Sequence, residues 1–149
     1  MVMKKLALGL VACWAAWQVS AAEDLWLTDL SKAQAQAKAE HKIVLMDFNG
    51  SDWCPPCKEL KKKVFSSPEF IQYAQKNLVL VDVDFPHHKD LGKSQTKQNE
   101  DLARKFSVEG FPTVVILDSN GKQLKKDTGY EGQTAKEYID ELQKLQKST

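Results

Sequence analysis

Three runs of apolar residues stand out along the chain, at 43–46, 78–81 and 111–117. Unbroken runs of this kind are typical of strands that are buried on both faces. The intervening stretches are rich in Ala, Gln, Lys and Glu, or carry apolar residues three and four positions apart, which indicates helices. We therefore expect helices at 28–40, 58–65, 68–77, 95–106 and 134–146, and strands at 43–48, 78–84, 111–117 and 122–127.

Local signals define several of these boundaries. Thr28 is a candidate N-cap for the first helix. Residues 67–69, Ser-Pro-Glu, combine a cap, a proline in the first helical turn and an acid behind it. Residues 118–121, Asp-Ser-Asn-Gly, predict a hairpin turn between the last two strands, and residues 134–137 form a capping box.

The order of the elements predicts the fold class. Helices separate the first two apolar strands, which favours parallel pairing through a crossover connection. The last two strands form an antiparallel hairpin. We expect an α/β protein with a mixed central β-sheet flanked by helices on both faces, and a chain of 149 residues is long enough for one domain with a substantial core.

The first 22 residues differ in character from the rest of the chain. Lys4 and Lys5 precede an apolar stretch at 6–17, and small residues at 19–22 offer a cleavage site. This pattern predicts a secretory signal peptide at 1–22, a domain at 23–149, and a periplasmic or secreted protein. A second interpretation places a lipid on Cys13, because residues 10–13 resemble a bacterial lipobox. The apolar character of residues 14–22 argues against it, since lipoproteins usually continue with a polar tether.

The net charge of the chain bears on which partners it could bind. The full chain has 21 basic and 20 acidic residues, and loss of Lys4 and Lys5 would leave a slight acidic excess. A near-neutral domain of mixed charge gives no support for binding to nucleic acid or to an anionic membrane.

Beyond the leader, Cys54 and Cys57 are the only cysteines. A disulfide between them closes a very short loop and adds little stability through chain entropy, so a purely structural role is disfavoured. A zinc site needs about four ligands, and no second cysteine pair accompanies His41, His87 and His88. We therefore favour a redox-active pair and expect no metal.

The predicted position of the pair suits thiol chemistry. Cys54 is expected at the start of a helix, where the partial positive charge of the helix terminus and free N–H groups stabilise a thiolate. Pro55 and Pro56 fit the first turn but remove two of those donors. In this interpretation Cys54 is the attacking nucleophile, and Cys57 resolves the mixed disulfide.

Two motifs resemble those of the thioredoxin superfamily. The first is Trp53-Cys54-x-x-Cys57-Lys58, after an apolar strand that ends in Asp47-Phe48. The second is Gly-Phe-Pro-Thr at 110–113, before another apolar strand. The resemblance covers roughly 42–146. Residues 64–70 also resemble exported thioredoxin-like proteins and the C-terminal periplasmic domain of the membrane thiol:disulfide interchange protein.

The resemblance implies a thioredoxin fold and specific roles for single residues. Pro112 corresponds to the cis-proline that faces the cysteines, and Phe111 would offer backbone groups to a substrate chain. Trp53 would cover the cysteines and contact partners. Asp47 corresponds to a buried carboxylate that takes the Cys57 proton.

Two departures from thioredoxin concern Asp47. The connection at 49–52 is one residue longer than in thioredoxin, and the strand at 78–81 has no lysine to accompany the acid. The alternative of an ordinary acid at a strand end therefore stays open.

His87 and His88 lie in a polar loop at 85–94, close in sequence to Asp82 and Asp84. A metal site is one interpretation of these residues, but side chains adjacent in sequence diverge on a loop. We favour a solvated or partner-contacting loop.

Together these features predict an exported thiol:disulfide oxidoreductase that exchanges Cys54 and Cys57 with protein thiols and disulfides, with the reductase direction favoured. No cofactor is expected, because the dithiol is itself the redox group. A membrane electron donor is the expected source of reducing equivalents, and no dimerisation segment is visible, so we expect a monomer. The alternative is a redox-silent thioredoxin-fold module that binds partner chains through the Phe111–Pro112 surface.

Overall fold

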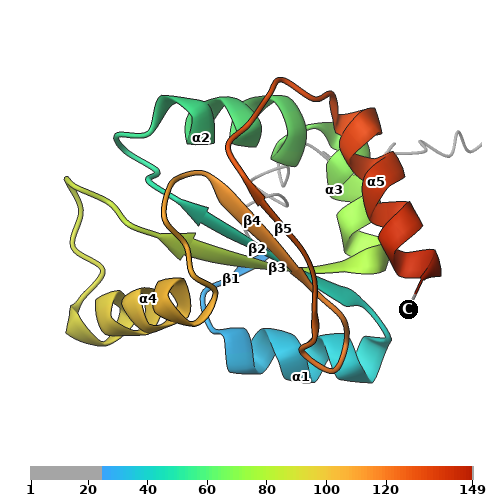
Figure 1. Ribbon diagram of the computed structural model, residues 1–149, viewed down its shortest axis with the longest axis horizontal. Helices are drawn as coiled ribbons and strands as arrows, with labels where there is room; N and C mark the ends of the chain where they lie inside the picture. Colours follow the sequence, from blue (N-terminus) through green and yellow to red (C-terminus); the bar gives the residue numbers. More distant parts are fainter. Residues whose placement is uncertain (1–24, 149) are drawn as a thin grey trace, which may run out of the picture.

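The computed structural model describes residues 25–148, so the predicted leader, its cleavage site and Cys13 lie outside the described residues (Figure 1). Within that range a five-stranded sheet is combined with helices. The elements, in chain order, are β1 (Trp26–Leu27), α1 (Leu30–Glu40), β2 (Ile43–Asn49), α2 (Pro55–Leu60), the π-helical turn η1 (Lys61–Phe65), α3 (Pro68–Asn77), β3 (Leu78–Asp84), α4 (Lys93–Lys105), β4 (Thr113–Leu117), β5 (Gln123–Thr128) and α5 (Ala135–Lys147).

The sheet is mixed, as the sequence predicts. Its strand order is β1-β3-β2-β4-β5. Strands β2 and β3 are parallel over their full length, with Ile43 opposite Leu78 and Asn49 opposite Asp84. Strand β4 runs antiparallel to β2, and β5 runs antiparallel to β4. The predicted α/β class is therefore confirmed.

Two apolar cores lie on the two faces of this sheet. Leu45 points toward α2, η1, α3 and α5, while its neighbour Val44 points toward α1 and α4. Figure 1 shows the two groups of helices on opposite sides of the strands. The alternation follows from the two-residue period of a strand, and both faces are apolar because helices cover both. None of the helices within 25–148 is long and apolar enough to cross a membrane.

Some predicted boundaries are confirmed and others are wrong. Ser67 caps α3, and Thr134 forms a capping box with Glu137 at the start of α5. Thr28 does not cap α1. Asp29 does so instead, because its carboxylate accepts the N–H of Lys32 at 3.1 Å.

Three strand and helix ends also differ from the prediction. Strand β4 begins at Thr113 rather than at 111, β5 covers Gln123–Thr128, and α4 begins at Lys93, directly after Gly92. Strand β1 was not predicted, because two residues are too few to show an alternating pattern.

The helix begins at the cysteine pair, as predicted for Cys54, and then changes its winding. Cys54 is the N-cap of α2, and Pro55 and Pro56 occupy its first turn, where missing N–H groups cost no helical hydrogen bond. The predicted segment 58–65 then continues as η1, which has the wider π-helical pitch.

Candidate active site

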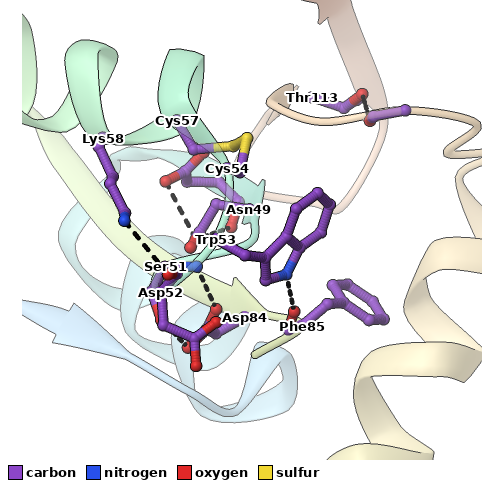
Figure 2. Close-up of a disulfide and its surroundings, with 12 residues drawn as sticks. Asn49, Ser51, Asp52, Trp53, Cys54, Cys57, Lys58, Asp84, Phe85 and Thr113 are labelled. Atoms are coloured by element: carbon purple, nitrogen blue, oxygen red, sulfur yellow. Dashed lines mark hydrogen bonds between the residues drawn. A yellow bond between two sulfur atoms is a disulfide. The ribbon is translucent and has the colours of Figure 1, made fainter. Parts of the chain in front are cut away.

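Cys54 and Cys57 are joined by a disulfide, with their Cα atoms 5.3 Å apart (Figure 2). Both residues are almost buried, with relative exposures of 3% and 4%. The pair lies where β2 ends and α2 begins, so the disulfide is at the C-terminal end of a central strand.

A tight turn carries the chain from β2 to Cys54. The N–H of Cys54 donates to the carbonyl of Gly50 at 2.9 Å. The indole of Trp53 folds back over Gly50, where a Cβ atom would lie 2.4 Å from Trp53 Cε2. Only glycine fits beneath the indole, so the turn depends on Gly50.

Trp53 belongs to a cluster of four rings beside the disulfide, which we call the aromatic wall: Trp53, Phe85, His87 and Phe111. Trp53 stacks on His87 with ring centroids 4.4 Å apart and planes 7° from parallel. It meets the Phe111 ring edge-on at 5.9 Å, and Phe111 lies 5.1 Å from Phe85. Trp53 Nε1 also donates to the carbonyl of Phe85 at 2.7 Å (Figure 2). The indole is thus fixed on three sides.

The Phe111–Pro112 peptide bond is cis. Pro112 precedes Thr113, which lies opposite Phe48 in the antiparallel pairing of β4 with β2. Pro112 therefore lies at the edge of the sheet from which the chain leaves β2 for the cysteines. The Phe111 ring contacts Trp53, so the structure brings the residues of both sequence motifs together at this edge.

Asp47 is buried in β2, with 7% of its surface exposed. It lies opposite Asp82 of β3, and Asn49 Nδ2 donates to Asp82 Oδ1 at 2.7 Å and to Asp47 Oδ2 at 3.2 Å. Among the residues that the structure describes, Asp47 Oδ1 has no hydrogen-bond partner. Burial, and then the nearby charges of Asp82 and Asp84, raise the pKa of Asp47 to about 8, and Lys61 opposes this rise.

The loop after β3 is fastened to the turn before Cys54. The Asp52 carboxylate accepts the backbone N–H groups of His87 at 2.9 Å and His88 at 2.7 Å. These hydrogen bonds, first that of His87, lower the pKa of Asp52. Asp84 accepts from the Ser51 N–H at 2.9 Å and from Ser51 Oγ at 2.6 Å, and it pairs with Lys89 at 2.9 Å.

Several of these contributors were not predicted. Asp52, Phe85 and Lys61 carry no motif, and their contacts depend on how the loop and η1 fold over the strand ends. The pair of Asp47 and Asp82 is visible in the sequence only as two acids at strand ends.

The histidines do not gather around a metal. The His87 ring stacks on Trp53. The His88 ring is nearly perpendicular to the His87 ring, and the centroids of the two rings are 6.3 Å apart. Within residues 25–148, no three His, Cys, Asp or Glu side chains converge in a way that could hold a metal ion.

Comparison with known proteins identifies the family. Residues 30–146 match the model of the thioredoxin-like domain. The chain belongs to the thioredoxin-like family. Its relatives include the disulfide bond reductase DsbH of Chlamydia pneumoniae, 33% identical over 122 residues that cover 82% of this chain and 73% of DsbH. The thiol:disulfide interchange protein DsbD of Photorhabdus laumondii is 33% identical over 91 residues, 61% of this chain but only 14% of DsbD.

Solved structures agree with this assignment. A DsbH oxidoreductase superposes with a TM-score of 0.75 and 28% identity over 99% of this chain and 96% of that chain. The oxidised C-terminal domain of DsbD from Neisseria meningitidis gives a TM-score of 0.56 at 21% identity over 80% of this chain and 98% of that domain, which supports the fold. This thioredoxin-like protein is a thiol:disulfide oxidoreductase that carries a Cys54–Cys57 disulfide.

Proposed function

We propose that this thioredoxin-like protein is an exported reductase of protein disulfides and that Cys54 and Cys57 carry the electron pair. The observation that carries the proposal is the Cys54–Cys57 disulfide at the N-terminus of α2, beside the aromatic wall. The name of the relative DsbH, a disulfide bond reductase, supports this direction. The predicted leader at 1–22 supports export to the periplasm.

The reaction proceeds in two exchanges. In the reduced enzyme the Cys54 thiolate attacks one sulfur of a substrate disulfide, and that bond breaks as a mixed disulfide forms. The substrate thiolate that leaves takes up a proton. Cys57 then loses its proton and attacks Cys54 Sγ, which releases the second substrate thiol. The substrate gains two electrons, and the enzyme is left with the Cys54–Cys57 disulfide.

Asp47 is the base that takes the Cys57 proton. An ordinary cysteine has a pKa of about 8.5, and burial raises the pKa of Asp47 to about 8. Two groups with such similar pKa values exchange a proton at little free-energy cost, which is the condition under which general base catalysis is efficient.

Substrate chains are held beside Cys54 by the cis-proline segment and the aromatic wall. Phe111 offers backbone groups to an extended substrate segment, and Trp53 contacts the side chains next to the substrate disulfide. The enzyme is reduced again by an external dithiol, for which a membrane protein is the candidate electron donor. No cofactor enters the scheme, and a monomer is sufficient for it.

Insulin reduction tests the first exchange. The reduced wild-type protein is expected to precipitate the insulin B chain in the presence of dithiothreitol, while Cys54→Ala reduces the rate to that of the reagent alone. Ser66→Ala, a substitution of a hydroxyl beyond η1 that leaves both cysteines intact, serves as the control. An active Cys54→Ala variant would overturn the proposal.

Trapping tests the second exchange and the direction. Without the resolving thiol, Cys57→Ala is expected to accumulate mixed disulfides through Cys54 in the periplasm, and mass spectrometry would identify the attached proteins. A wild-type protein that is isolated from the periplasm only as the disulfide, together with no partner trapped by Cys57→Ala, would contradict the reductase direction. Partner binding that survives loss of both cysteines would instead support a redox-silent module that acts through the Phe111–Pro112 surface.

A further inference from the structure

Strands β2 and β3 place three carboxyl groups and one amide side chain side by side beneath η1. The parallel register sets Asp47 opposite Asp82 and Asn49 opposite Asp84. These residues continue the alternation of Ile43, Leu45, Leu78 and Leu80, which face α2, η1, α3 and α5. Adjacent strands are about 4.8 Å apart, so the two opposed carboxylates share one small region of space.

Asn49 connects these two carboxylates. Its side-chain nitrogen has two hydrogens, and it lies within hydrogen-bond distance of both Asp82 Oδ1 and Asp47 Oδ2. A proton that arrives on either carboxylate changes what the amide donates to the other. The protonation of Asp82 therefore influences the protonation of Asp47 through a direct contact, in addition to the repulsion of two like charges.

A cavity of about 260 Å³ adjoins the same residues. Asp47, Asn49 and Asp82 line it from the sheet, and Lys61 and Lys89 line it from η1 and from the loop after β3. This volume has room for several water molecules, which in the liquid occupy about 30 Å³ each. Asp47 Oδ1, buried and without a hydrogen-bond partner among residues 25–148, is a natural acceptor for one of them. Asp82, which also lines the cavity, is only partly buried.

The charges around Asp47 come from every element packed against it. Asp82 and Asp84 of β3 are negative, Lys61 of η1 and Lys89 of the loop are positive, and Tyr138 of α5 is close enough for the Asp47 charge to raise the pKa of the phenol beyond the effect of burial. Cys57 of α2 is the thiol to be deprotonated. Asp84 is already engaged by Ser51 and Lys89, so Asp82 and Lys61 have the most freedom to tune Asp47.

We propose that Asp82 and Lys61 are positioning residues that tune the general base Asp47 in opposite directions, Asp82 through Asn49, and that the cavity beneath η1 carries the proton from Asp47 to solvent. This inference rests on the proposed function for its catalytic consequence. In each turnover the proton leaves Cys57 Sγ for Asp47 and then passes through water in the cavity, beside Asp82. In thioredoxin a lysine on the neighbouring strand accompanies the buried acid, whereas here the lysine comes from η1 and the strand supplies a carboxylate.

The proposal predicts the direction in which each substitution moves the pKa of Asp47. The negative charge of Asp82 opposes ionisation of Asp47, so Asp82→Asn lowers the pKa of Asp47. The positive charge of Lys61 favours ionisation, so Lys61→Met raises it. Lys62→Met removes the same charge from the neighbouring position of η1, a residue that does not line the cavity, and serves as the matched control.

The direct test is a carboxyl titration by ¹³C NMR on the oxidised protein, labelled at aspartate, with Asp47→Asn used to assign the resonance. We expect the Asp47 midpoint to move down by about one pH unit in Asp82→Asn and up by a similar amount in Lys61→Met, with a much smaller shift in Lys62→Met. Equal shifts in both lysine variants, or shifts of one sign in Asp82→Asn and Lys61→Met, would overturn the inference. If Asp82→Asn does not fold, the comparison of the two exposed lysine variants decides it.

A kinetic measurement separates this inference from the proposed function. The rate at which Cys57 resolves a mixed disulfide between Cys54 and a small aromatic thiol is followed against pH in the same variants. The pH profile should move with the NMR midpoint. If the protein is active in exchange but the Asp47 midpoints do not move in the variants, the inference is wrong and the proposed function stands. If the Asp47 midpoints shift but the protein has no exchange activity, the proposed function is wrong, and the coupling of Asp82 and Lys61 to Asp47 stands.

Discussion

Asp47 is the residue whose surroundings differ most from those of a solvated carboxyl group. Burial is the main cause of the rise in its pKa from 3.8 to about 8. Between these two values the folded protein retains a proton that the unfolded chain releases, so folding stability falls as the pH rises. Below pH 3.8 the carboxyl is protonated in both states, and the contribution is fully present.

Replacement of Asp47 should therefore make the protein more stable in alkaline solution. Asp47→Asn keeps the shape and cannot ionise, so relative to wild type we expect it to gain about 3 to 4 kcal/mol in unfolding free energy between pH 5 and pH 9. Urea denaturation across this range measures the difference. A weaker slope remains in the variant, because burial also raises the pKa of Asp82.

Asp101 provides the control for this experiment. It lies exposed on α4, and its hydrogen bond to Lys97 lowers its pKa rather than raising it. Asp101 is ionised in both the folded and the unfolded state above about pH 5, so Asp101→Asn should leave the pH dependence between pH 5 and pH 9 unchanged. A profile for Asp47→Asn that parallels wild type would show that this carboxyl remains ionised in the native protein.

At the scale of elements, the site depends on how the loop after β3 is attached to the turn before α2. One carboxylate, Asp52, receives two consecutive backbone N–H groups of that loop. The loop in turn supplies His87, which stacks on Trp53 next to Cys54. The position of the indole therefore depends on a side chain that touches neither sulfur.

Asp52→Ala should release this loop. The carboxylate is the acceptor for both N–H groups, so we expect amide exchange at His87 and His88 to accelerate about tenfold. Hydrogen exchange measured by NMR checks this expectation. Asp90→Ala removes a carboxylate that caps Gly92 within the same loop and should leave exchange at His87 and His88 near wild type. Unchanged exchange in Asp52→Ala would mean that the aromatic stack alone holds the loop.

Some helices and strands could be predicted from the sequence, and others could not. The apolar runs and the caps at Ser67 and Thr134 act locally, so β2, β3, α3 and α5 could be predicted from neighbouring residues. The π-helical winding of η1 could not, because Lys61 to Phe65 has ordinary helical spacing. Val64 and Phe65 of this turn are packed in the core, a tertiary contact that no local pattern records.

The same distinction applies to the site. Cys54, Cys57, Trp53, Phe111 and Pro112 lie in two short motifs and could be found from the sequence. The relation of Asp47 to Asp82 depends on strand register, which no local pattern records. The longer connection at 49–52 left an ordinary acid at a strand end as an alternative, and the structure buries Asp47 instead.

For the molecule as a whole, one sheet separates two cores that share no side chains. Leu45 belongs to the core under α3 and α5, and Leu102 of α4 belongs to the other. Both cores use the same strands, so we expect them to unfold in a single cooperative transition.

A double-mutant cycle would test this arrangement. Leu45→Ala and Leu102→Ala should each destabilise the protein by about 2 to 5 kcal/mol, and their effects should add within about 0.5 kcal/mol because the sheet lies between them. Leu45→Ala with Ile116→Val, its cross-strand neighbour on the same face, should be non-additive. Urea denaturation gives all the values. Strong coupling across the sheet, or two separate transitions, would contradict the two-core description.

The recessed position of Cys54 has a consequence for the choice of substrates. Only 3% of the surface of this residue is exposed, so we expect narrow, protruding segments to reach it more easily than flat protein surfaces. A disulfide locked inside a finished domain cannot reach it, whereas one on a mobile loop or in an unfinished chain can. The enzyme would thus sort disulfides by the freedom of the chain around them, and act mainly on proteins early in their maturation.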